Sequence, residues 1–301
     1  MLYPELRELL KLKTTVTYGN LQFDKSSNRT QGDYASLFHG LGVEFETVRP
    51  YVVGDDVRYI DWRVTARIGK PQVKTFRAES DRNVLLVIDA NAYMRFGTRV
   101  TFKSIQAAKI AALLCWKSMQ QQDRVGGLVF GDIPNGIQYF KPTKTDESIL
   151  QLLKTLCNTK TDNHAPVPLV AALKQLQPVV TPQSLIFIIS DFSLQPINEL
   201  EKAILNLRQK CKIVLLPVHD PADRDIPDIG QIVFSDGQQQ ELLNTNNRRA
   251  RKIYNNLWQN YVTALQQLAK KINVPLLWVE TTLDPAKCLF SKTGSILKWK
   301  N

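Results

Sequence analysis

Apolar runs that alternate with helical spacings dominate the sequence from residue 84 onwards. The segments 84–89 and 185–191 are each an apolar run that ends in an acidic residue. Continuous apolar runs of this length are typical of strands buried on both faces of a parallel sheet. Further strands are predicted at 125–130, 137–140, 213–218 and 273–280, and helices at 105–119, 149–156, 169–176, 197–207 and 254–271.

Strands that alternate with helices of this length predict parallel βαβ units, and therefore an α/β fold with a doubly wound, mostly parallel sheet. The pattern before residue 84 is different. It indicates a short amphipathic helix at 4–13, an irregular polar segment at 14–40, and short β-type stretches within 45–62 and at 73–76. We therefore divide the chain into an N-terminal β-containing extension, an α/β domain and a basic C-terminal tail. Their bounds are 1–83, 84–281 and 282–301.

Two acidic residues follow predicted strands at the edge where open parallel sheets form their sites. Asp89 ends the first apolar run and Asp191 ends the second, and ligands bind outside the carboxyl ends of such strands. The two carboxylates could hold a hard divalent cation. Each could instead cap the helix that follows it.

The usual catalytic motifs are missing around these acids. The sequence contains no Walker A, G-x-G-x-x-G or G-x-S-x-G pattern, and its 3 histidines have no nucleophile or metal partner at a recognisable spacing. The glycine pair at 126–127 indicates close backbone packing rather than phosphate binding. The 4 cysteines stand without a C-x-x-C spacing, which favours buried thiols in a reducing compartment.

The densest motif of charged residues lies between residues 45 and 67. Its residues include Arg49, Asp55, Asp56, Arg58, Asp61, Trp62 and Arg67. With these residues the motif resembles a bacterial family of unknown function that is encoded beside MoxR-type AAA+ ATPases and joins this motif region to a von Willebrand factor A-like domain. The side chains of the adjacent acids Asp55 and Asp56 are expected to point opposite ways in an extended chain, so they are not expected to form a shared catalytic acid pair.

This motif has two interpretations. The first is a scaffold, in which ion pairs fix the extension and Trp62 is a buried apolar anchor. The second is a recognition surface, because Arg and Trp dominate the energetics of many interfaces. The first interpretation is the one favoured by the sequence.

The resemblance also has consequences for Asp89 and Asp191. Such A-like domains can bind a metal ion through Asp-x-Ser-x-Ser after the first strand, a Thr from a later loop, and an Asp after the fourth strand. In this sequence Asn91 and Tyr93 stand at the two Ser positions, and Val167 stands at the Thr position. Because three of the five ligand positions have changed, the resemblance implies a degenerate site with no metal and no cofactor. Each acid is then expected to find a donor, either a backbone N–H group or a basic side chain such as Arg95. The corresponding positions here are Asp89, Asn91, Tyr93, Val167 and Asp191.

The charge is strongly positive and unevenly spread. The chain carries 39 basic and 28 acidic residues, a net charge of +11. Residues 1–83 contribute 13 − 11 = +2 and residues 84–301 contribute 26 − 17 = +9, which favours acidic partners. The segment 248–252 opens the last long helix with cations that oppose the helix dipole. An acidic partner would offset this repulsion, and a solvated charged face is the alternative.

These observations favour a non-enzymatic protein–protein interaction protein. By resemblance, it would act as an adaptor for a MoxR-type AAA+ ATPase in the assembly or maturation of a protein complex. One alternative is a metal-dependent enzyme using Asp89 and Asp191, which the replaced Ser and Thr ligands argue against. Another is a nucleic-acid-binding protein using the basic C-terminal half, although no known binding module is evident. With no signal-peptide pattern and no apolar run of membrane length, a cytoplasmic location is expected.

Overall fold

The computed structural model describes residues 3–18, 45–52, 55–76, 82–159, 166–193, 196–235 and 240–290. The chain divides into two compact units. The motif unit is Ser36–Asp81, and the larger unit combines Met1–Ala35 with Arg82–Asn301. The predicted boundary at 83/84 lies two residues from the end of the motif unit, whereas the N-terminal helix belongs to the larger unit.

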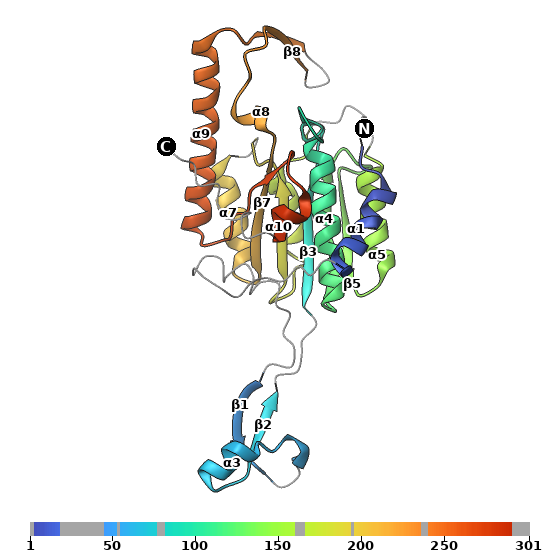
Figure 1. The fold of residues 1–301 in the computed structure, drawn as a ribbon, viewed down its shortest axis with the longest axis vertical. Coiled ribbons are helices and arrows are strands. Elements are labelled where there is room, and N and C mark those ends of the chain that lie inside the picture. Colours follow the sequence, from blue (N-terminus) through green and yellow to red (C-terminus); the bar gives the residue numbers. More distant parts are fainter. Residues whose placement is uncertain are drawn as a thin grey trace. The chain divides into compact units, whose positions relative to one another are not determined.

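A six-stranded sheet forms the centre of the larger unit (Figure 1). Its order is β10-β7-β6-β3-β4-β5, and only the edge strand β5 runs antiparallel to its neighbour. The chain enters at the central strand β3, fills one edge and then crosses back to fill the other. The predicted α/β class with a doubly wound, mostly parallel sheet is confirmed. The strands are β3 (Asn83–Ala90), β4 (Arg124–Gly131), β5 (Ile137–Thr143), β6 (Leu185–Ser190), β7 (Lys212–His219) and β10 (Val279–Glu280).

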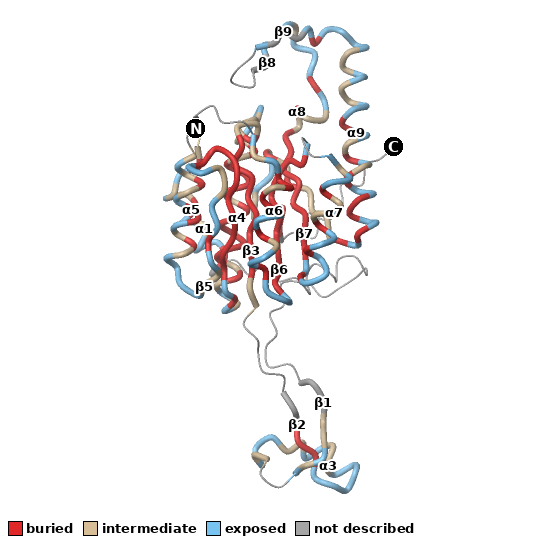
Figure 2. Tube along the Cα trace, turned by 180° about the vertical axis from the view of Figure 1, so that it is seen from behind, coloured by how far each residue is buried: buried red, intermediate tan, exposed pale blue. Residues whose placement is uncertain are grey.

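Helices cover both faces of this sheet. α4 contacts β3, β4, β6 and β7, and α1, α5 and α10 pack around it. On the opposite face, side chains of α6, α7 and α9 share one apolar cluster with Leu85 and Val87 of β3. Figure 2 shows that burial is concentrated along the strands and the inner sides of these helices. The helices are α1 (Leu6–Tyr18), α4 (Lys103–Gln120), α5 (Asp146–Cys157), α6 (Leu169–Leu176), α7 (Ile197–Arg208), α8 (Pro221–Arg224), α9 (Arg248–Lys271) and α10 (Pro285–Phe290).

The glycine pair in β4 lets two backbones approach closely, as predicted. A Cβ atom on Gly126 would lie 2.5 Å from the carbonyl oxygen of Phe140, and one on Gly127 would lie 2.3 Å from that of Leu86. Side chains do not fit at such distances. These glycines therefore allow β4 to pack closely between β3 and β5 in the observed register.

α1 is tied to α4 by a polar contact within an apolar interface. The indole Nε1 of Trp116 donates to the carbonyl oxygen of Leu9 at 3.1 Å, and the ammonium group of Lys13 lies 4.9 Å from the Trp116 ring centre. At the other end of the chain, α10 also packs on α4. The described part of the predicted tail 282–301 is therefore helical at Pro285–Phe290, and residues 291–301 lie outside the described residues.

A hairpin that the sequence analysis did not predict precedes α9. β8 (Gln231–Ser235) pairs antiparallel with β9 (Gln240–Asn244), apart from the main sheet. The basic segment 248–252 forms the first residues of α9, as expected. The packing of α9 on the sheet includes the rings of Trp258, Tyr261, Trp278 and His219, whose centres lie 5.3–6.1 Å apart.

The motif unit is a small antiparallel pair with a helical connection. β1 (Phe45–Pro50) pairs with β2 (Gln72–Phe76), which confirms the β-type stretches. Between them lie the 3₁₀ turn η1 (Val57–Tyr59) and the helix α3 (Trp62–Ile68), which the sequence analysis did not predict. α3 ends at Gly69, whose φ of +72° is the left-handed conformation common after a helix.

Candidate functional site

The two acids predicted to lie at strand ends are buried at neighbouring positions of the sheet. Asp89 lies near the carboxyl end of β3, and Asp191 directly follows β6, the neighbouring parallel strand. Their exposed fractions are only 1% and 6%. Buried carboxylates need compensation by donors or counter-charges, so the surrounding contacts decide what this site can do.

Four donors surround the carboxylate of Asp89. Its Oδ1 accepts from the backbone N and the side-chain Nδ2 of Asn91, at 3.0 and 2.7 Å. Its Oδ2 accepts from the hydroxyl groups of Tyr93 and Ser190, at 2.7 and 2.6 Å. All four donors belong to three residues of the chain, Asn91, Tyr93 and Ser190. Ser190 was not singled out by the sequence analysis.

Asn91 links this cluster to the loop before α6. Its Oδ1 accepts from the backbone N–H of Val167 at 2.8 Å, and its Nδ2 donates to the carbonyl oxygen of Val167 at 3.1 Å. The structure thus brings Val167 to the site, as the predicted correspondence required. It acts through its backbone, since its side chain has no polar atom.

A buried lysine balances the second acid. The Nζ of Lys103, the first residue of α4, lies 3.0 Å from Asp191 Oδ2 and 3.4 Å from Asp223 Oδ2. Lys103 is 5% exposed, and its ammonium group lies 5.4 Å from the ring centre of Phe96. The second oxygen of Asp191, Oδ1, accepts from the backbone N and the hydroxyl group of Ser193.

Both expected kinds of donor are present, backbone N–H groups and a basic side chain, but the basic side chain is not that of Arg95, which was given as the example. Its guanidinium group instead pairs with Asp132 at 2.5 Å. Lys103 takes the expected role. It lies 88 residues before Asp191 in the sequence, and it reaches that acid because α4 begins at the same edge of the sheet.

Burial and charge shift the pKa values of the cluster. Burial, and secondarily the charge of Asp191, raises the pKa of Asp89 to about 6. Burial also raises the pKa of the Tyr93 hydroxyl, so Tyr93 stays a donor. For Lys103, burial lowers the pKa, but the charges of Asp191 and Asp223 outweigh it, and the net shift is upward. Lys103 is therefore a permanent internal cation.

These residues do not fit a divalent metal ion. Both oxygens of Asp89 are occupied by donors, the Asn91 amide oxygen accepts from Val167, and an ammonium group already lies against Asp191. Mg²⁺ needs several free oxygen ligands in near-octahedral geometry. Among the described residues, no group of three or more His, Cys, Asp or Glu is arranged to hold a metal.

In the motif unit, the acids serve local structure. The two oxygens of Asp55 accept from the guanidinium of Arg49 at 2.6 and 2.7 Å, and this bond lowers the pKa of Asp55. Asp56 pairs with Arg58 at 2.7 Å. Asp61 caps α3 by accepting from the backbone N–H groups of its first turn. These charges therefore form short-range contacts within the motif unit rather than one network.

The expectation that Trp62 is a buried anchor is wrong. As the first residue of α3, it has an exposed fraction of 69%. Arg67, five residues further along the same helix, is also exposed. A single short helix capped by Asp61 leaves no second layer in the described part of the motif unit to cover the indole ring. These two motif residues are available for contact.

The four cysteines are free thiols. Cys115, Cys211 and Cys288 are buried, in line with the predicted buried thiols, and Cys157 is half-buried. Burial raises the pKa of Cys115 and raises those of the other three to about 11. Thiols with raised pKa values are poor nucleophiles at neutral pH.

We predict that Lys103→Met destabilises the protein strongly. It leaves the buried Asp191 and the half-buried Asp223 without a counter-charge, and breaking a buried ion pair typically costs about 3–5 kcal/mol. The matched control is Lys109→Met on the same helix, whose ammonium group lies 3.7 Å from the half-exposed Glu8, and it should cost less than about 1 kcal/mol. Urea unfolding at neutral pH measures both. Equal midpoints for the two variants would contradict the role given to Lys103.

We also predict a pH effect that Asp89→Asn removes. The folded pKa of about 6 exceeds the ordinary value of 3.8, so the stabilisation is complete below about pH 4 and is lost as the pH rises through 6. At roughly 1.4 kcal/mol per pKa unit, the loss amounts to about 3 kcal/mol. His219, whose burial lowers its pKa to about 4, contributes the opposite slope, but it is present in both proteins. The wild-type stability minus that of Asp89→Asn should therefore fall between pH 4 and 6.5. A constant difference would be incompatible with this assignment.

Comparison with known proteins finds relatives of similar sequence. The uncharacterized proteins Rv1480 of Mycobacterium tuberculosis (strain ATCC 25618 / H37Rv) and Mb1516 of Mycobacterium bovis (strain ATCC BAA-935 / AF2122/97) are each 31% identical over 210 residues. The match covers 69% of this chain and 64% of theirs, so the chain spans a little under two thirds of the length of these curated relatives.

Solved structures show similarity at low identity. They include the conserved hypothetical protein BatB from Bacteroides thetaiotaomicron, with a TM-score of 0.45 and 16% identity over 71% of this chain and 95% of that one. The SpRpn10 VWA domain has a TM-score of 0.42 and 11% identity over 70% and 94%. An aerotolerance-related membrane protein from Bacteroides fragilis NCTC 9343 has a TM-score of 0.44 and 15% identity over 71% and 100%.

In this chain, none of the helices in the described ranges is both long and apolar enough to cross a membrane.

The model of one protein family, described as protein of unknown function DUF58, matches residues 47–262. That match includes the motif residues from Arg49 to Arg67 and reaches into α9. The chain belongs to the DUF58 family.

Proposed function

We propose that this protein is a non-enzymatic interaction protein that serves as an adaptor for a MoxR-type AAA+ ATPase during assembly or maturation of a protein complex. The observation that carries the proposal is the exposure of Trp62 within the family-like motif. An exposed tryptophan costs solubility and is among the residues most enriched at interface hot spots. The ATPase as partner comes from the resemblance alone, and a cytoplasmic location stays a prediction.

The surroundings of Trp62 support a contact surface. Arg63 and Arg67 lie one helical turn apart on α3, both exposed, and neither has an ion-pair partner among the described residues. Aromatic and arginine side chains together are the usual composition of interface anchors. The motif unit also exposes other large apolar side chains, with fractions between 49% and 62%. They are Val52, Val57, Tyr59 and Ile68.

The state of the acids supports a role without catalysis. The carboxylate oxygens of Asp55, Asp56 and Asp61 accept hydrogen bonds from groups within the motif unit. At the strand ends, the oxygens of Asp89 and Asp191 are likewise engaged by donors of the chain. A general base needs a carboxylate that can reach a substrate proton, and these carboxylates are directed to partners inside the protein.

We predict that Trp62→Ala weakens binding to the MoxR-type ATPase of the same genome by about 2 kcal/mol or more, roughly 30-fold. Its stability should change by less than about 0.5 kcal/mol because the side chain is exposed. Tyr139→Ala is the matched control, an exposed aromatic (38%) on β5 of the larger unit. Calorimetry with both purified proteins gives the affinities, and thermal unfolding gives the stabilities.

Two results would contradict the proposal. The first is that the wild-type chain does not bind the purified ATPase. The second is that Trp62→Ala binds it as tightly as Tyr139→Ala does, which would remove the motif unit from the interface.

A further inference from the structure

We propose that the larger unit carries a binding site for an acidic, partly apolar segment of a partner protein, formed by two adjoining cavities that share the segment 225–227. This site uses neither the motif unit nor the strand-end acids, and it does not rest on the proposed ATPase partnership.

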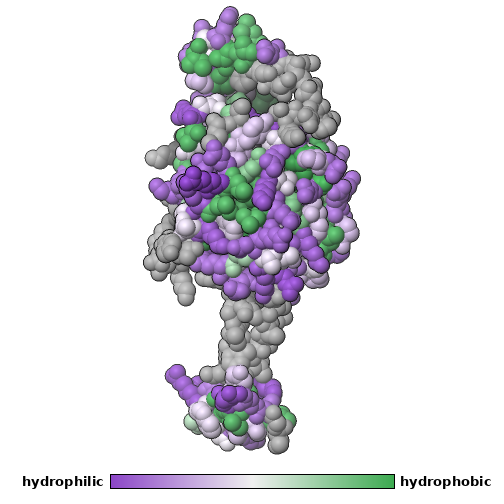
Figure 3. Space-filling view, turned by 90° about the vertical axis from the view of Figure 1, so that its right-hand side faces the viewer, coloured by the Kyte–Doolittle hydropathy of each residue, from purple (hydrophilic) through white to green (hydrophobic). Residues whose placement is uncertain are grey.

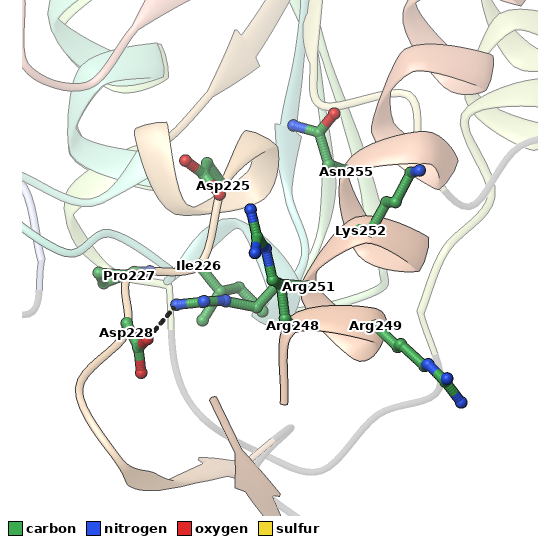
Figure 4. A pocket seen from close by; sticks show the side chains of 9 residues that line it. All are labelled: Asp225, Ile226, Pro227, Asp228, Arg248, Arg249, Arg251, Lys252 and Asn255. Atoms are coloured by element: carbon green, nitrogen blue, oxygen red, sulfur yellow. Dashed lines mark ion pairs between the residues drawn. The ribbon is translucent and has the colours of Figure 1, made fainter. Parts of the chain in front are cut away.

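The first cavity lies between the start of α9 and the segment that follows α8, and has a volume of about 740 Å³. Figure 4 shows the guanidinium groups of Arg248 and Arg251 reaching into the space between these elements. The side chains of Arg249 and Lys252 extend outward along its rim. Four basic residues and two acids, Asp225 and Asp228, thus line this cavity.

Most of this positive charge is unbalanced. Arg251 pairs with Asp228 at 2.9 Å, but within the described ranges Arg248, Arg249 and Lys252 have no ion-pair partner. Like charges this close on one helix, at its positive end, are destabilising. The side chain of Asn247 already caps the backbone N–H groups of Arg249 and Ala250, and the charge offered to an occupant is that of the basic side chains. An anionic occupant would offset their repulsion.

The second cavity, of about 650 Å³, is lined mainly by apolar side chains. They come from the loop after β3, from the segment after α8 and from β8, and include Phe96, Ile229 and Val233. Ile226 and Pro227 line both cavities. An occupant that crosses this segment would therefore meet cations on one side and apolar walls on the other.

The apolar character continues onto the hairpin. Val233 of β8 pairs across the hairpin with Leu242 of β9, and the two side chains are 60% and 64% exposed. Figure 3 shows apolar surface gathered at the end of the larger unit where these strands lie. Exposed apolar surface next to a charged cluster is typical of a site for another protein.

Hydrogen bonds fix α8, which leads directly into the segment 225–227 between the cavities. Asp220, which caps α8, accepts from the backbone N and the hydroxyl group of Thr98, at 3.1 and 2.6 Å. From α9, Tyr254 donates to the carbonyl oxygen of Ala222 at 2.9 Å, and Asn255 to that of Arg224 at 3.1 Å. A wall fixed before binding lowers the entropy cost of association.

An acidic protein segment fits this lining better than a nucleic acid does. Single strands bind by stacking bases on aromatic side chains along a basic groove, whereas Phe96 is the one aromatic residue among those that line the two described cavities. A regular chain of phosphates would also pass Asp225 and Asp228. A peptide in which acidic residues alternate with apolar ones could place its carboxylates in the basic cavity and its apolar side chains in the apolar cavity.

The test uses the full chain and fluorescence anisotropy with three labelled probes. They are a short peptide of glutamates interspersed with leucine and phenylalanine, an oligoglutamate of the same charge, and an oligothymidine of the same charge. The site variants are Arg248→Glu/Arg249→Glu/Lys252→Glu and, separately, Val233→Asp. The charge-matched control, Lys174→Glu/Lys202→Glu/Lys210→Glu, changes exposed lysines outside the two cavities.

The mixed peptide should bind the wild-type chain at least about tenfold more tightly than oligoglutamate. The triple site variant should weaken its binding at least about tenfold, and the control less than about threefold. Val233→Asp should weaken the mixed peptide but not oligoglutamate. Acids at a helix N-terminus suit the dipole, so the triple variant should unfold at no lower temperature than wild type, and its loss of binding is then not a loss of fold.

Three results would overturn the proposal. Equal losses in the site and control triples would show that net charge alone attracts the peptide. Oligoglutamate binding as tight as that of the mixed peptide would exclude a role for the apolar cavity. Tighter binding of oligothymidine would assign the basic surface to nucleic acid.

Discussion

The ammonium group of Lys103 lies in the interior between Asp191 and Asp223, and three parts of the fold meet at it. These are the start of α4, the end of β6 and the short helix α8. Removing two carboxylates and an ammonium from water costs several kcal/mol per ion unless they balance one another. The contacts at this edge of the sheet therefore depend on the lysine, because without it the acids could not remain buried and charged together.

The polar side chains of this cluster are engaged with one another rather than with solvent. Asp89 is enclosed by the donors of Asn91, Tyr93 and Ser190. In the described part of the chain, the carboxylate oxygens of Asp89 and Asp191 are therefore occupied by internal donors. The groups left open lie elsewhere, in the exposed Trp62 of the motif unit and in the basic side chains at the start of α9. The molecule thus combines a fixed core with separate surfaces suited to protein contacts.

Sequence reasoning predicts the sheet well because its signal is local. Continuous apolar runs that end in Asp89 and Asp191 mark buried parallel strands, and strand ends necessarily meet at one edge. Lys103 could not be predicted in the same way. A lysine that begins a helix ordinarily lies in solvent, and its burial is decided by an acid 88 residues further along the chain.

Trp62 is the opposite case, an aromatic residue that was expected to be buried and is exposed. A tryptophan in a motif rich in ion pairs is normally expected in a core, yet the described part of the motif unit has one strand pair and one short helix, too little structure to cover it. The hairpin β8–β9 was missed because its strands are short and carry many polar residues, as in Gln240–Asn244. In these cases tertiary context, rather than residue pattern, decides between burial and exposure.

Calorimetric titration of the full chain with Mg²⁺ and Mn²⁺ tests most directly whether an internal ammonium has replaced a metal ion here. With Lys103 against Asp191 and every oxygen of Asp89 engaged, the account predicts titrations without binding heat. Micromolar binding that disappears in Asp89→Ala would contradict it, because the carboxylates would then be free to exchange their internal donors for a cation.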